Sequence, residues 1–362
     1  MKLSISKKSN SKILIINHNN KSIPFYSSWL YERSKNNDIR DSETGQLLIE
    51  ASDIENNLKI IDTILSDKKL TIKFSDNTVH NYDLLELLNE ISFSQNNDQN
   101  KILWNKKNIK IKKFNFHKFN SQMLRNILIN IDTHGFAYIK NIPVTKNGLQ
   151  SLSDHIGPIK RTNWGEIADI KSISNAYDLT MTTRTLENHT DNPYRFPTQG
   201  YIFLHCLKNS ELGGENSLVD GFNIAQIMKN KNKKDFNLLS SYKTFFRYKD
   251  KTTCLENSCS LIELDDNNNV IQVRFNNRTE VLPYDTIKNL KAYRSARKKF
   301  WNEITSKKNN LIIKQEPGDM IIIDNYRIFH GRKGYVDKNN SRYFRQGYMD
   351  RDILQSKLKL LR

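Results

Sequence analysis

One short segment and one distant histidine carry the residue types of a metal site. Residues 188–193 read Asn-His-Thr-Asp-Asn-Pro, which places His189 and Asp191 two positions apart, and His330 follows much later in the chain. In an extended segment His189 and Asp191 lie on the same side, and another strand could bring His330 to them. Two imidazoles and one carboxylate leave one face of an octahedral ion open, as non-haem Fe(II) oxygenases require for a chelating cosubstrate and O2. The same spacing also occurs in surface loops and helix N-caps, so spacing alone does not establish a metal.

The sequence around His330 predicts a hairpin that would hold this histidine rigidly. Its predicted order is a turn at residues 317–319, an apolar strand at 320–323, a second turn at 324–325 and a strand at 326–330 that ends at His330. A histidine at the end of such a strand is delivered from a sheet to a fixed point.

Arg342 lies in an alternating segment shortly after this hairpin. A guanidinium group binds a carboxylate through two parallel N–H bonds, which suits Arg342 to the distal carboxylate of 2-oxoglutarate. The keto acid end of 2-oxoglutarate would then bind the ion. Arg332 and Arg345 are the next candidates for the distal carboxylate.

Composition sets bounds on the fold and on the partners. The chain has 362 residues, of which 37% are hydrophobic, so it can bury a core, and its length favours two domains. A formal net charge of +18 is a reason to consider a nucleic-acid partner. However, the lysines are scattered among Asn, Ser and Asp, as in residues 229–235, and do not line a face interleaved with aromatic residues. The charge therefore indicates a solvated basic surface rather than a nucleic-acid site.

Membrane and secretion signals are weak in this sequence. No apolar run approaches the roughly 18 residues that a membrane span needs. The run at residues 13–16 is too short for the apolar part of a signal peptide. The three cysteines, Cys206, Cys254 and Cys259, do not make a disulfide framework. We therefore expect a cytoplasmic protein with no membrane partner.

Residues 1–100 are predicted to form a small N-terminal α+β domain. The predicted elements are strands at residues 12–16, 46–50 and 69–74 and a helix at 82–91. Residues 92–101 are polar, without apolar periodicity, and are predicted to be a linker.

Residues 101–362 are predicted to form the second domain. The predicted elements are a helix from Ser121 that Gly135 closes, a strand at 136–139, a helix at 146–155, a strand at 198–207, and a basic helix at 284–306 that buries Ile287, Leu290, Tyr293, Phe300 and Trp301. Strands flanked by helices without regular β-α alternation favour a mixed α+β fold with a double-stranded β-helix (jelly-roll) core and flanking helices.

The chain resembles the gamma-butyrobetaine hydroxylase and trimethyllysine hydroxylase family, within the TauD-like superfamily of Fe(II)/2-oxoglutarate dioxygenases. The matching stretches are Trp104, residues 135–138, residues 188–193, residues 200–206 (GYIFLHC), residues 213–214, residues 218–222, residues 317–319, residues 324–327, residues 330–332 and residues 341–342. They occur in the family's order. Residues 29–30 and 47–51 of the N-terminal region resemble the family's small domain.

The resemblance implies an enzyme that hydroxylates a small amino-acid-like or betaine-like substrate and releases succinate and CO2. It implies Fe(II), O2 and 2-oxoglutarate as cofactors and cosubstrates, stimulation by ascorbate, and a homodimer. It implies that His189, Asp191 and His330 are metal ligands and catalytic residues. The residues implied to bind 2-oxoglutarate are Arg342 and Leu204, and those implied to bind the substrate are Trp164, Asp178, Met181, Asn276 and Tyr348.

Two departures from the family pattern bear on its cofactors and substrate. Family members often hold a structural zinc with three cysteines and a histidine, but the segment after Leu30 has no cysteine, and His80 alone cannot make a tetrahedral site. We therefore predict that this chain binds no zinc. The family also holds quaternary ammonium groups in an aromatic cage. The corresponding positions here are Trp164, Ala168, Met181 and Tyr348, so that two aromatic residues stand where four are expected.

The substrate and three alternative functions stay open at this point. Asp178 could pair with an amino group, so we expect a substrate with a primary amine and a carboxylate to be preferred over gamma-butyrobetaine. A tailoring oxygenase that hydroxylates or desaturates an amino-acid-derived metabolite is the main alternative. A nucleic-acid oxygenase and a non-catalytic binding module are the other two, although an open-faced metal site would have no use in a binding module.

Overall fold

A computed structural model describes residues 4–7, 11–18, 21–95, 101–173, 176, 178–336 and 342–361. The chain divides into two compact units, Met1–Gln99 and Asn100–Arg362. Each unit has its own buried apolar core and is described by itself. The described residues include no helix that is both long and apolar enough to cross a membrane.

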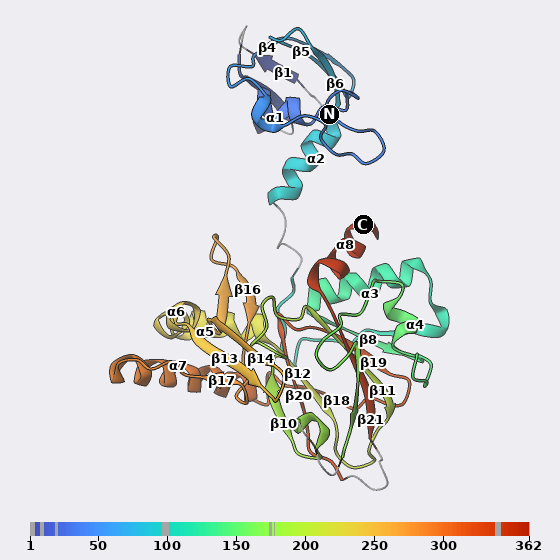
Figure 1. The fold of residues 1–362 in the computed structure, drawn as a ribbon, viewed down its shortest axis with the longest axis vertical. Helices are drawn as coiled ribbons and strands as arrows, with labels where there is room; N and C mark the ends of the chain where they lie inside the picture. Colours follow the sequence, from blue (N-terminus) through green and yellow to red (C-terminus); the bar gives the residue numbers. More distant parts are fainter. Residues whose placement is uncertain are drawn as a thin grey trace. The chain divides into compact units, whose positions relative to one another are not determined.

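The smaller unit is built from two three-stranded antiparallel sheets and short helices (Figure 1). Its elements are β1 (Ser4–Lys7), β2 (Ile13–His18), β3 (Lys21–Tyr26), α1 (Ser27–Glu32), the 3-10 turn η1 (Ala51–Asp53), β4 (Ile60–Ser66), β5 (Lys69–Phe74), β6 (Val79–Asp83) and α2 (Leu84–Gln95). The sheet orders are β1-β2-β3 and β4-β5-β6. Alternate residues of β2 and β5 point into one core, as the period of a strand requires.

Two predictions for this unit were wrong in detail. Residues 46–50 do not form a strand, since Leu47 makes only an isolated bridge to Arg40 and the neighbouring leucine side chain is 58% exposed. The helix begins at Leu84 and not at residue 82, because β6 continues to Asp83, whose carboxylate accepts hydrogen bonds from two backbone N–H groups of the first turn. The helix runs to Gln95, into the predicted linker, and residues 96–100 of that linker lie outside the described residues.

His80 is a packed core residue of the smaller unit. Its ring lies 4.6 Å from the ring of Tyr31 and 5.1 Å from that of Phe74, measured between centroids, and it is 1% exposed. Burial lowers the pKa of His80. Burial among these rings favours the neutral form of the imidazole.

The larger unit combines strands and helices along its whole length. Its first elements are β7 (Lys113–Asn115), η2 (Phe116–Lys118), α3 (Ser121–His134), β8 (Phe136–Lys140), α4 (Gln150–Ser153), β9 (Ile167–Lys171), η3 (Leu179–Met181), β10 (Leu186–His189), β11 (Tyr201–Lys208) and β12 (Asn216–Asp220). The remaining elements are α5 (Gly221–Lys231), α6 (Lys233–Ser241), β13 (Thr244–Lys249), β14 (Cys254–Cys259), β15 (Ile262–Leu264), β16 (Val270–Val273), β17 (Glu280–Val281), α7 (Ile287–Thr305), β18 (Leu311–Ile313), β19 (Met320–Asp324), β20 (Ile328–Arg332), β21 (Tyr343–Met349) and α8 (Arg351–Leu361).

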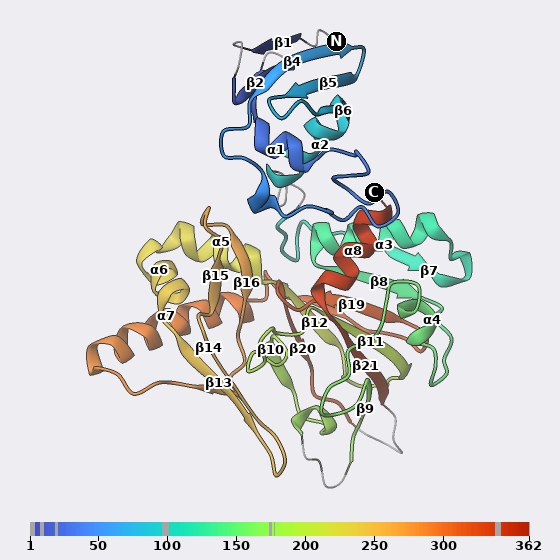
Figure 2. The same cartoon turned by 45° about the horizontal axis from the view of Figure 1, so that its top comes forward.

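Two sheets form the centre of the larger unit. One has the order β7-β8-β19-β11-β21-β9, and the other has the order β10-β20-β12-β18, whose first three strands are seen side by side in Figure 2. Ile202 and Ile321 of the first sheet and Leu218 and Ile328 of the second belong to one apolar core, so the sheets pack through these faces. The prediction of a mixed α+β chain is confirmed, while the jelly-roll topology stays a prediction.

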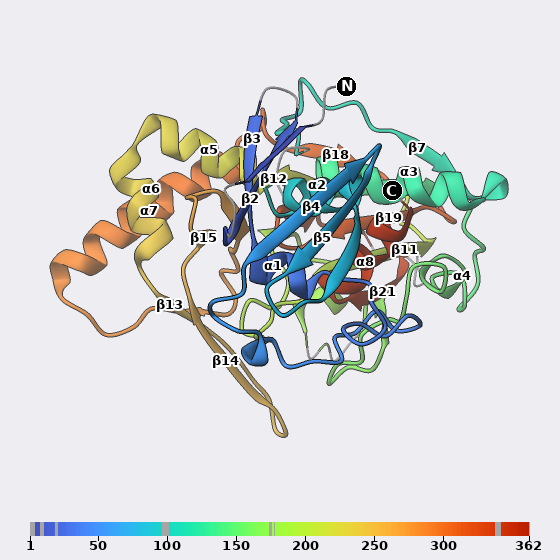
Figure 3. The same cartoon turned by 90° about the horizontal axis from the view of Figure 1, so that it is seen from above.

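Helices cover the sheets on opposite sides. α5, α6 and α7 gather at one side, and α3 and α4 lie at the other (Figure 3). The predicted basic helix exists, but it begins at Ile287, whose side chain is 72% exposed, because Thr286 caps it at this point. Its buried face consists of Tyr293, Ala296, Phe300 and Ile304, and Leu290 and Trp301 are only partly buried. The predicted helix at 146–155 is reduced to Gln150–Ser153.

A buried ion pair ties the hairpin of β19 and β20 to the rest of the unit. Arg327 Nε lies 3.0 Å from Asp220 Oδ1, and Arg327 Nη2 lies 2.8 Å from Asp220 Oδ2, with both side chains at most 1% exposed. The guanidinium also donates to the backbone carbonyls of Thr133 and Ile102. The hydrogen-bonding capacity of the buried charges is therefore largely met.

Gly135 connects α3 to β8 in a conformation that other residues rarely adopt. Its φ is +83°, and its N–H donates to the carbonyl of Ile131, as in a helix C-cap. A Cβ at this position would lie 2.7 Å from Ile328 Cδ1. Both the backbone angle and the close approach of the β20 side chain therefore require glycine.

We expect Gly135→Ala to lower the free energy of unfolding by about 1–3 kcal/mol, because a left-handed conformation is strained for any residue with a Cβ. Urea unfolding followed by circular dichroism measures this change. Gly45→Ala is the matched control, since Gly45 also has a positive φ of +69° but would meet no atom within 4 Å. If the two variants lose equal stability, the contact with Ile328 contributes nothing.

Candidate metal centre and substrate cavity

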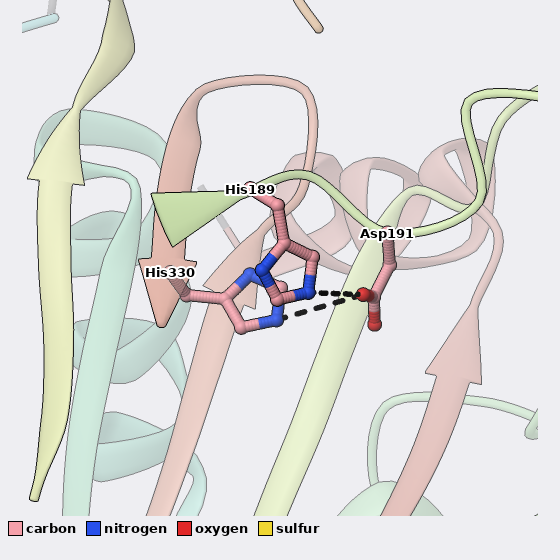
Figure 4. A group of neighbouring side chains, drawn as sticks. All are labelled: His189, Asp191 and His330. Carbon is pink, nitrogen blue, oxygen red and sulfur yellow. Dashed lines mark ion pairs between the residues drawn. The ribbon is translucent and has the colours of Figure 1, made fainter. Parts of the chain in front are cut away.

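The two histidines of the predicted metal site face each other across neighbouring strands. β10 and β20 run antiparallel, and His189 lies directly opposite His330 in their register. The ring centroids are 4.5 Å apart. Asp191 follows β10, and its Oδ1 lies 3.2 Å from His189 Nε2 and 3.6 Å from His330 Nε2 (Figure 4). The possible ligand atoms all lie within 4.8 Å of one another, so one ion can contact all three side chains.

The surroundings favour the charge states in which these side chains bind a metal. His189 Nδ1 lies 2.7 Å from the carbonyl oxygen of Glu187, and a proton on this nitrogen leaves Nε2 free to face Asp191. Burial lowers the pKa of His330 to about 3, so its imidazole is neutral at pH 7. Burial alone would raise the pKa of Asp191, but interactions with His330 and His189 outweigh it and lower the pKa below its ordinary value. Imidazole nitrogens and a carboxylate are ligands that Fe(II) accepts.

Asn325 anchors the backbone of Asp191 from the turn between β19 and β20. Its Oδ1 accepts from the N–H of Asp191 at 2.8 Å, and its Nδ2 donates to the carbonyl of Asp191 at 3.0 Å. Asn325 is fully buried, and the same Nδ2 donates to the carbonyl of Gln199 at 2.9 Å. The predicted hairpin therefore delivers His330 and also anchors Asp191. The strand that carries His330 continues beyond the predicted end, to Arg332.

The other oxygen of the Asp191 carboxylate faces β21. Asp191 Oδ2 accepts from the Tyr348 hydroxyl at 2.8 Å and from Gln346 Nε2 at 2.9 Å. Gln346 Nε2 also lies 2.6 Å from the Tyr348 hydroxyl oxygen. Burial and the neighbouring charge of Asp191 raise the pKa of Tyr348, which keeps its hydroxyl protonated and able to donate. Tyr348 thus contacts a candidate metal ligand directly.

Arg342 is a buried cation that forms no ion pair with any carboxylate among the described residues. It is 3% exposed, and its guanidinium carbon lies 3.9 Å from the centroid of the Phe344 ring and 5.4 Å from that of Tyr335. In the part of the chain that the structure describes, no carboxylate forms an ion pair with Arg342, and its Nε has no hydrogen-bond partner. Burial and the charge of Arg332 lower the pKa of Arg342 to about 10, so it stays charged at pH 7. A buried charge of this kind calls for an anionic ligand.

The two alternative arginines are engaged elsewhere. Arg332 donates to the backbone carbonyls of Thr180, Thr182 and Arg184 at 2.6–2.9 Å. Arg345 Nε lies 3.0 Å from a carboxylate oxygen of Asp169, and its guanidinium also donates to a backbone carbonyl. Arg342 therefore remains the best candidate among the three for the distal carboxylate of 2-oxoglutarate.

Leu204 lies on β11, in the middle of the six-stranded sheet. It pairs with Gln346 on one side and with Ile321 on the other. Its side chain is partly buried and packs against the core shared by the two sheets. The structure thus places Leu204 next to the strand that carries Gln346, and its contact with 2-oxoglutarate stays a prediction.

A cavity of about 620 Å³ opens beside Asp191. Its wall includes all five residues predicted to bind the substrate, namely Trp164, Asp178, Met181, Asn276 and Tyr348. Asp191 also lines the cavity, which brings the candidate metal cluster and the candidate substrate residues to one place. A volume of this size suits a small molecule.

Two of these five residues already make hydrogen bonds within the protein. Asp178 caps η3, since its Oδ1 accepts from the backbone N–H of Thr180 at 2.8 Å and from the Thr180 hydroxyl at 2.7 Å. Asn276 Nδ2 donates to the carbonyl of Thr190 at 3.0 Å, and Asn276 Oδ1 accepts from the N–H of Arg278 at 3.2 Å. Asn276 therefore positions the backbone beside Asp191, and its amide has little capacity left for a substrate carboxylate.

The cavity has more aromatic residues in its wall than the two predicted from the sequence, Trp164 and Tyr348. Tyr194 and Tyr248 line it in addition to Trp164 and Tyr348. The Tyr248 ring lies 5.3 Å from the Trp164 ring and 5.3 Å from the Tyr194 ring, between centroids. Tyr194 lies close enough to the His-x-Asp segment to be considered from sequence alone. Tyr248 comes from β13, and no local pattern links it to the metal site.

Arg278 is a further cavity residue that the sequence did not single out. Among the described residues, no carboxylate forms an ion pair with its guanidinium. Arg278 is solvent-exposed, and it adds a cation without an ion pair among the described residues to the aromatic wall and Asp178.

The chain is similar in sequence to known dioxygenases. Human gamma-butyrobetaine dioxygenase is 32% identical over 221 residues, which cover 59% of this chain and 57% of that protein. The match thus spans little more than half of that relative. Mouse mitochondrial trimethyllysine dioxygenase is 26% identical over 349 residues, which cover 92% of this chain and 82% of that protein. The solved structure of the non-heme iron oxygenase OrfP with Fe and alpha-ketoglutaric acid aligns with a TM-score of 0.49 at 16% identity, covering 66% of this chain and 81% of that one.

The family model described as taurine catabolism dioxygenase TauD, TfdA family, matches residues 100–348. This range contains the His-Asp-His cluster, Arg342 and all the substrate residues predicted from the sequence. The match covers more than half of the chain, and the chain therefore belongs to the TauD/TfdA family of dioxygenases.

Proposed function

We propose that this protein is an Fe(II)- and 2-oxoglutarate-dependent dioxygenase that hydroxylates a small amino-acid-like or betaine-like substrate. The observation that carries the proposal is the position of Asp191, which belongs to the His-Asp-His cluster and also lines the cavity. A substrate in this cavity would lie beside an ion held by that cluster.

Each part of the site has a separate task in this proposal. His189, Asp191 and His330 hold Fe(II), which together with 2-oxoglutarate and O2 supplies the oxidising chemistry and yields succinate and CO2. Arg342 binds the distal carboxylate of 2-oxoglutarate, because it is a buried guanidinium that no acid of the described chain neutralises.

The cavity residues favour a substrate with charges of both signs. Trp164, Tyr194 and Tyr248 line the cavity, and Asp178 adds a carboxylate. Aromatic rings of this kind attract an ammonium group. Arg278 supplies an unpaired cation for a substrate carboxylate. The aromatic wall is larger than the sequence indicated, so it suits methylated and primary ammonium groups alike, and Asp178 is the residue that distinguishes between them.

A substrate panel with succinate release as the readout tests this proposal. The panel contains gamma-butyrobetaine, trimethyllysine, lysine and free aromatic amino acids, each with Fe(II) and 2-oxoglutarate. We expect succinate release that depends on Fe(II) and is stimulated by at least one of the ammonium-bearing substrates. No Fe(II)-dependent consumption of 2-oxoglutarate under any condition would reject the proposal. Salt-sensitive binding of DNA or RNA with stimulated turnover would instead support a nucleic-acid oxygenase.

Asp178→Asn is expected to weaken turnover of primary-amine substrates selectively. A primary ammonium donates hydrogen bonds to a carboxylate and a trimethylammonium group does not, and a charge-assisted bond contributes about 1.5–3 kcal/mol, or about 10- to 150-fold in kcat/KM. Asparagine keeps an oxygen that can accept from Thr180, so the cap of η3 is retained. We measure kcat/KM for lysine and for gamma-butyrobetaine with both proteins. Equal losses for the two substrates would show that Asp178 has only its capping role.

A further inference from the structure

The two oxygens of the Asp191 carboxylate have separate surroundings. Oδ1 faces the two imidazoles, at 3.2 and 3.6 Å from their Nε2 atoms. Oδ2 faces away from them and accepts from the Tyr348 hydroxyl and Gln346 Nε2 at 2.8 and 2.9 Å. The carboxylate is thus divided into an oxygen that faces the metal position and an oxygen that is bound to the protein.

The two groups that donate to Asp191 Oδ2 are also hydrogen-bonded to each other. Gln346 Nε2 has two hydrogens, which reach Asp191 Oδ2 and the Tyr348 hydroxyl oxygen at 2.9 and 2.6 Å. The Tyr348 hydroxyl has one hydrogen, which it donates to the same Oδ2. The three groups are therefore hydrogen-bonded to one another, and removal of the Tyr348 hydroxyl or of the Gln346 amide leaves Asp191 Oδ2 with one hydrogen bond fewer.

The backbone that carries the two donors is held on both sides. β21 lies between β11 and β9, with Gln346 opposite Leu204 and Ala168, and Tyr348 opposite Ile202. Gln346 and Tyr348 are two positions apart on one strand, so both side chains point to the same face of the sheet. The backbone of the acceptor, Asp191, is fixed separately by hydrogen bonds to Asn325. With both backbones fixed, the Asp191 carboxylate could still rotate, and its hydrogen bonds to Tyr348 and Gln346 restrict this rotation.

We propose that Tyr348 and Gln346 are positioning residues that hold Asp191 Oδ2 and thereby present a single oxygen, Oδ1, to the metal. This inference rests on the proposed function, since it assigns a role toward the same ion. Tyr348 then has two roles. Its ring lines the cavity, and its hydroxyl orients a metal ligand. A carboxylate held by one oxygen leaves the opposite face of the ion open for 2-oxoglutarate and O2, whereas a freely rotating carboxylate can occupy a further position with its second oxygen.

The main test of the positioning role is the Fe(II) affinity of Tyr348→Phe, because this variant keeps the ring and removes only the hydroxyl. We titrate the purified protein with Fe(II) under anaerobic conditions, without 2-oxoglutarate or substrate, and follow binding by calorimetry. Residues that orient a metal ligand typically change metal affinity by about 10- to 100-fold, and we expect a loss in this range for Tyr348→Phe. Gln346→Leu removes the other donor and is expected to weaken Fe(II) binding in the same range.

Tyr194→Phe is the matched control for the loss of a buried hydroxyl at the same cavity. The Tyr194 hydroxyl donates to Asn192 Oδ1 at 2.7 Å and makes no hydrogen bond to Asp191. We expect its Fe(II) affinity to stay within about twofold of the unaltered protein, since no metal-orienting group is removed. Thermal unfolding of each variant without metal shows whether the fold is retained, and Gln346→Leu decides the question if Tyr348→Phe does not fold.

The outcomes separate this inference from the proposed function. If the unaltered protein binds Fe(II) and Asp191→Ala does not, but Tyr348→Phe and Gln346→Leu bind as tightly as the unaltered protein, the positioning role is wrong and the metal site stands. If the unaltered protein does not bind Fe(II), the proposed function fails and this inference fails with it. An equal loss of affinity in Tyr194→Phe would also overturn the inference, because it would point to a general effect of the cavity wall.

Discussion

Asp191→Ala is expected to abolish Fe(II)-dependent turnover of 2-oxoglutarate while leaving the fold intact. The substitution removes the anionic ligand between His189 and His330 and leaves two neutral imidazoles, which hold Fe(II) far less well. The backbone of residue 191 keeps its hydrogen bonds to Asn325, since these involve main-chain atoms alone. Succinate release measures turnover, and circular dichroism verifies the fold.

Asp285→Ala is a suitable control for this experiment. Asp285 is a half-buried carboxylate that accepts from the Tyr242 hydroxyl at 3.0 Å, and it does not line the cavity. Its removal is expected to leave 2-oxoglutarate turnover unchanged. Full activity of Asp191→Ala would show that the ligand assignment is wrong.

Arg342→Ala is expected to raise the 2-oxoglutarate concentration needed for half-maximal turnover by about 30-fold to several thousand-fold. Removing one partner of a buried charge pair costs about 2–5 kcal/mol, because the other charge is left buried without its partner. That other charge is the distal carboxylate of 2-oxoglutarate, and no second arginine of the three candidates is free to replace Arg342. Initial rates of succinate release at increasing 2-oxoglutarate concentrations measure the effect.

Arg342→Lys and Arg345→Ala refine this prediction. Lysine keeps the positive charge but lacks the planar pair of donors, so we expect only partial recovery. Arg345 is already paired with Asp169, and its removal is expected to change the 2-oxoglutarate requirement far less than the removal of Arg342. An unchanged requirement in Arg342→Ala, together with a large increase in Arg345→Ala, would assign the distal carboxylate to Arg345 instead.

Local sequence patterns predicted the parts of the site that neighbouring residues determine. The two-residue spacing of His189 and Asp191 and the turns that flank residues 320–323 follow from the geometry of strands and turns. The structure accordingly has a hairpin of β19 and β20 that carries His330, and the three side chains lie together. Local patterns failed where packing outweighed propensity. The apolar run at residues 46–50 and the predicted helix at 146–155 have apolar residues at suitable spacing, but neither forms the predicted element in full.

The tertiary structure alone decided which partners these residues have. No pattern in the sequence shows that Arg332 and Arg345 have polar partners while Arg342 has no carboxylate partner among the described residues, because the partners of Arg332 and Arg345 lie on distant segments. The same reason applies to Tyr248, which reaches the cavity from β13, and to the two donors on β21 that hold Asp191 Oδ2. Residue types and spacing along one strand determine what chemistry a side chain can perform. The pairing and register of strands far apart in the chain determine which side chains meet, and therefore which charge stays unpaired and which carboxylate oxygen stays free.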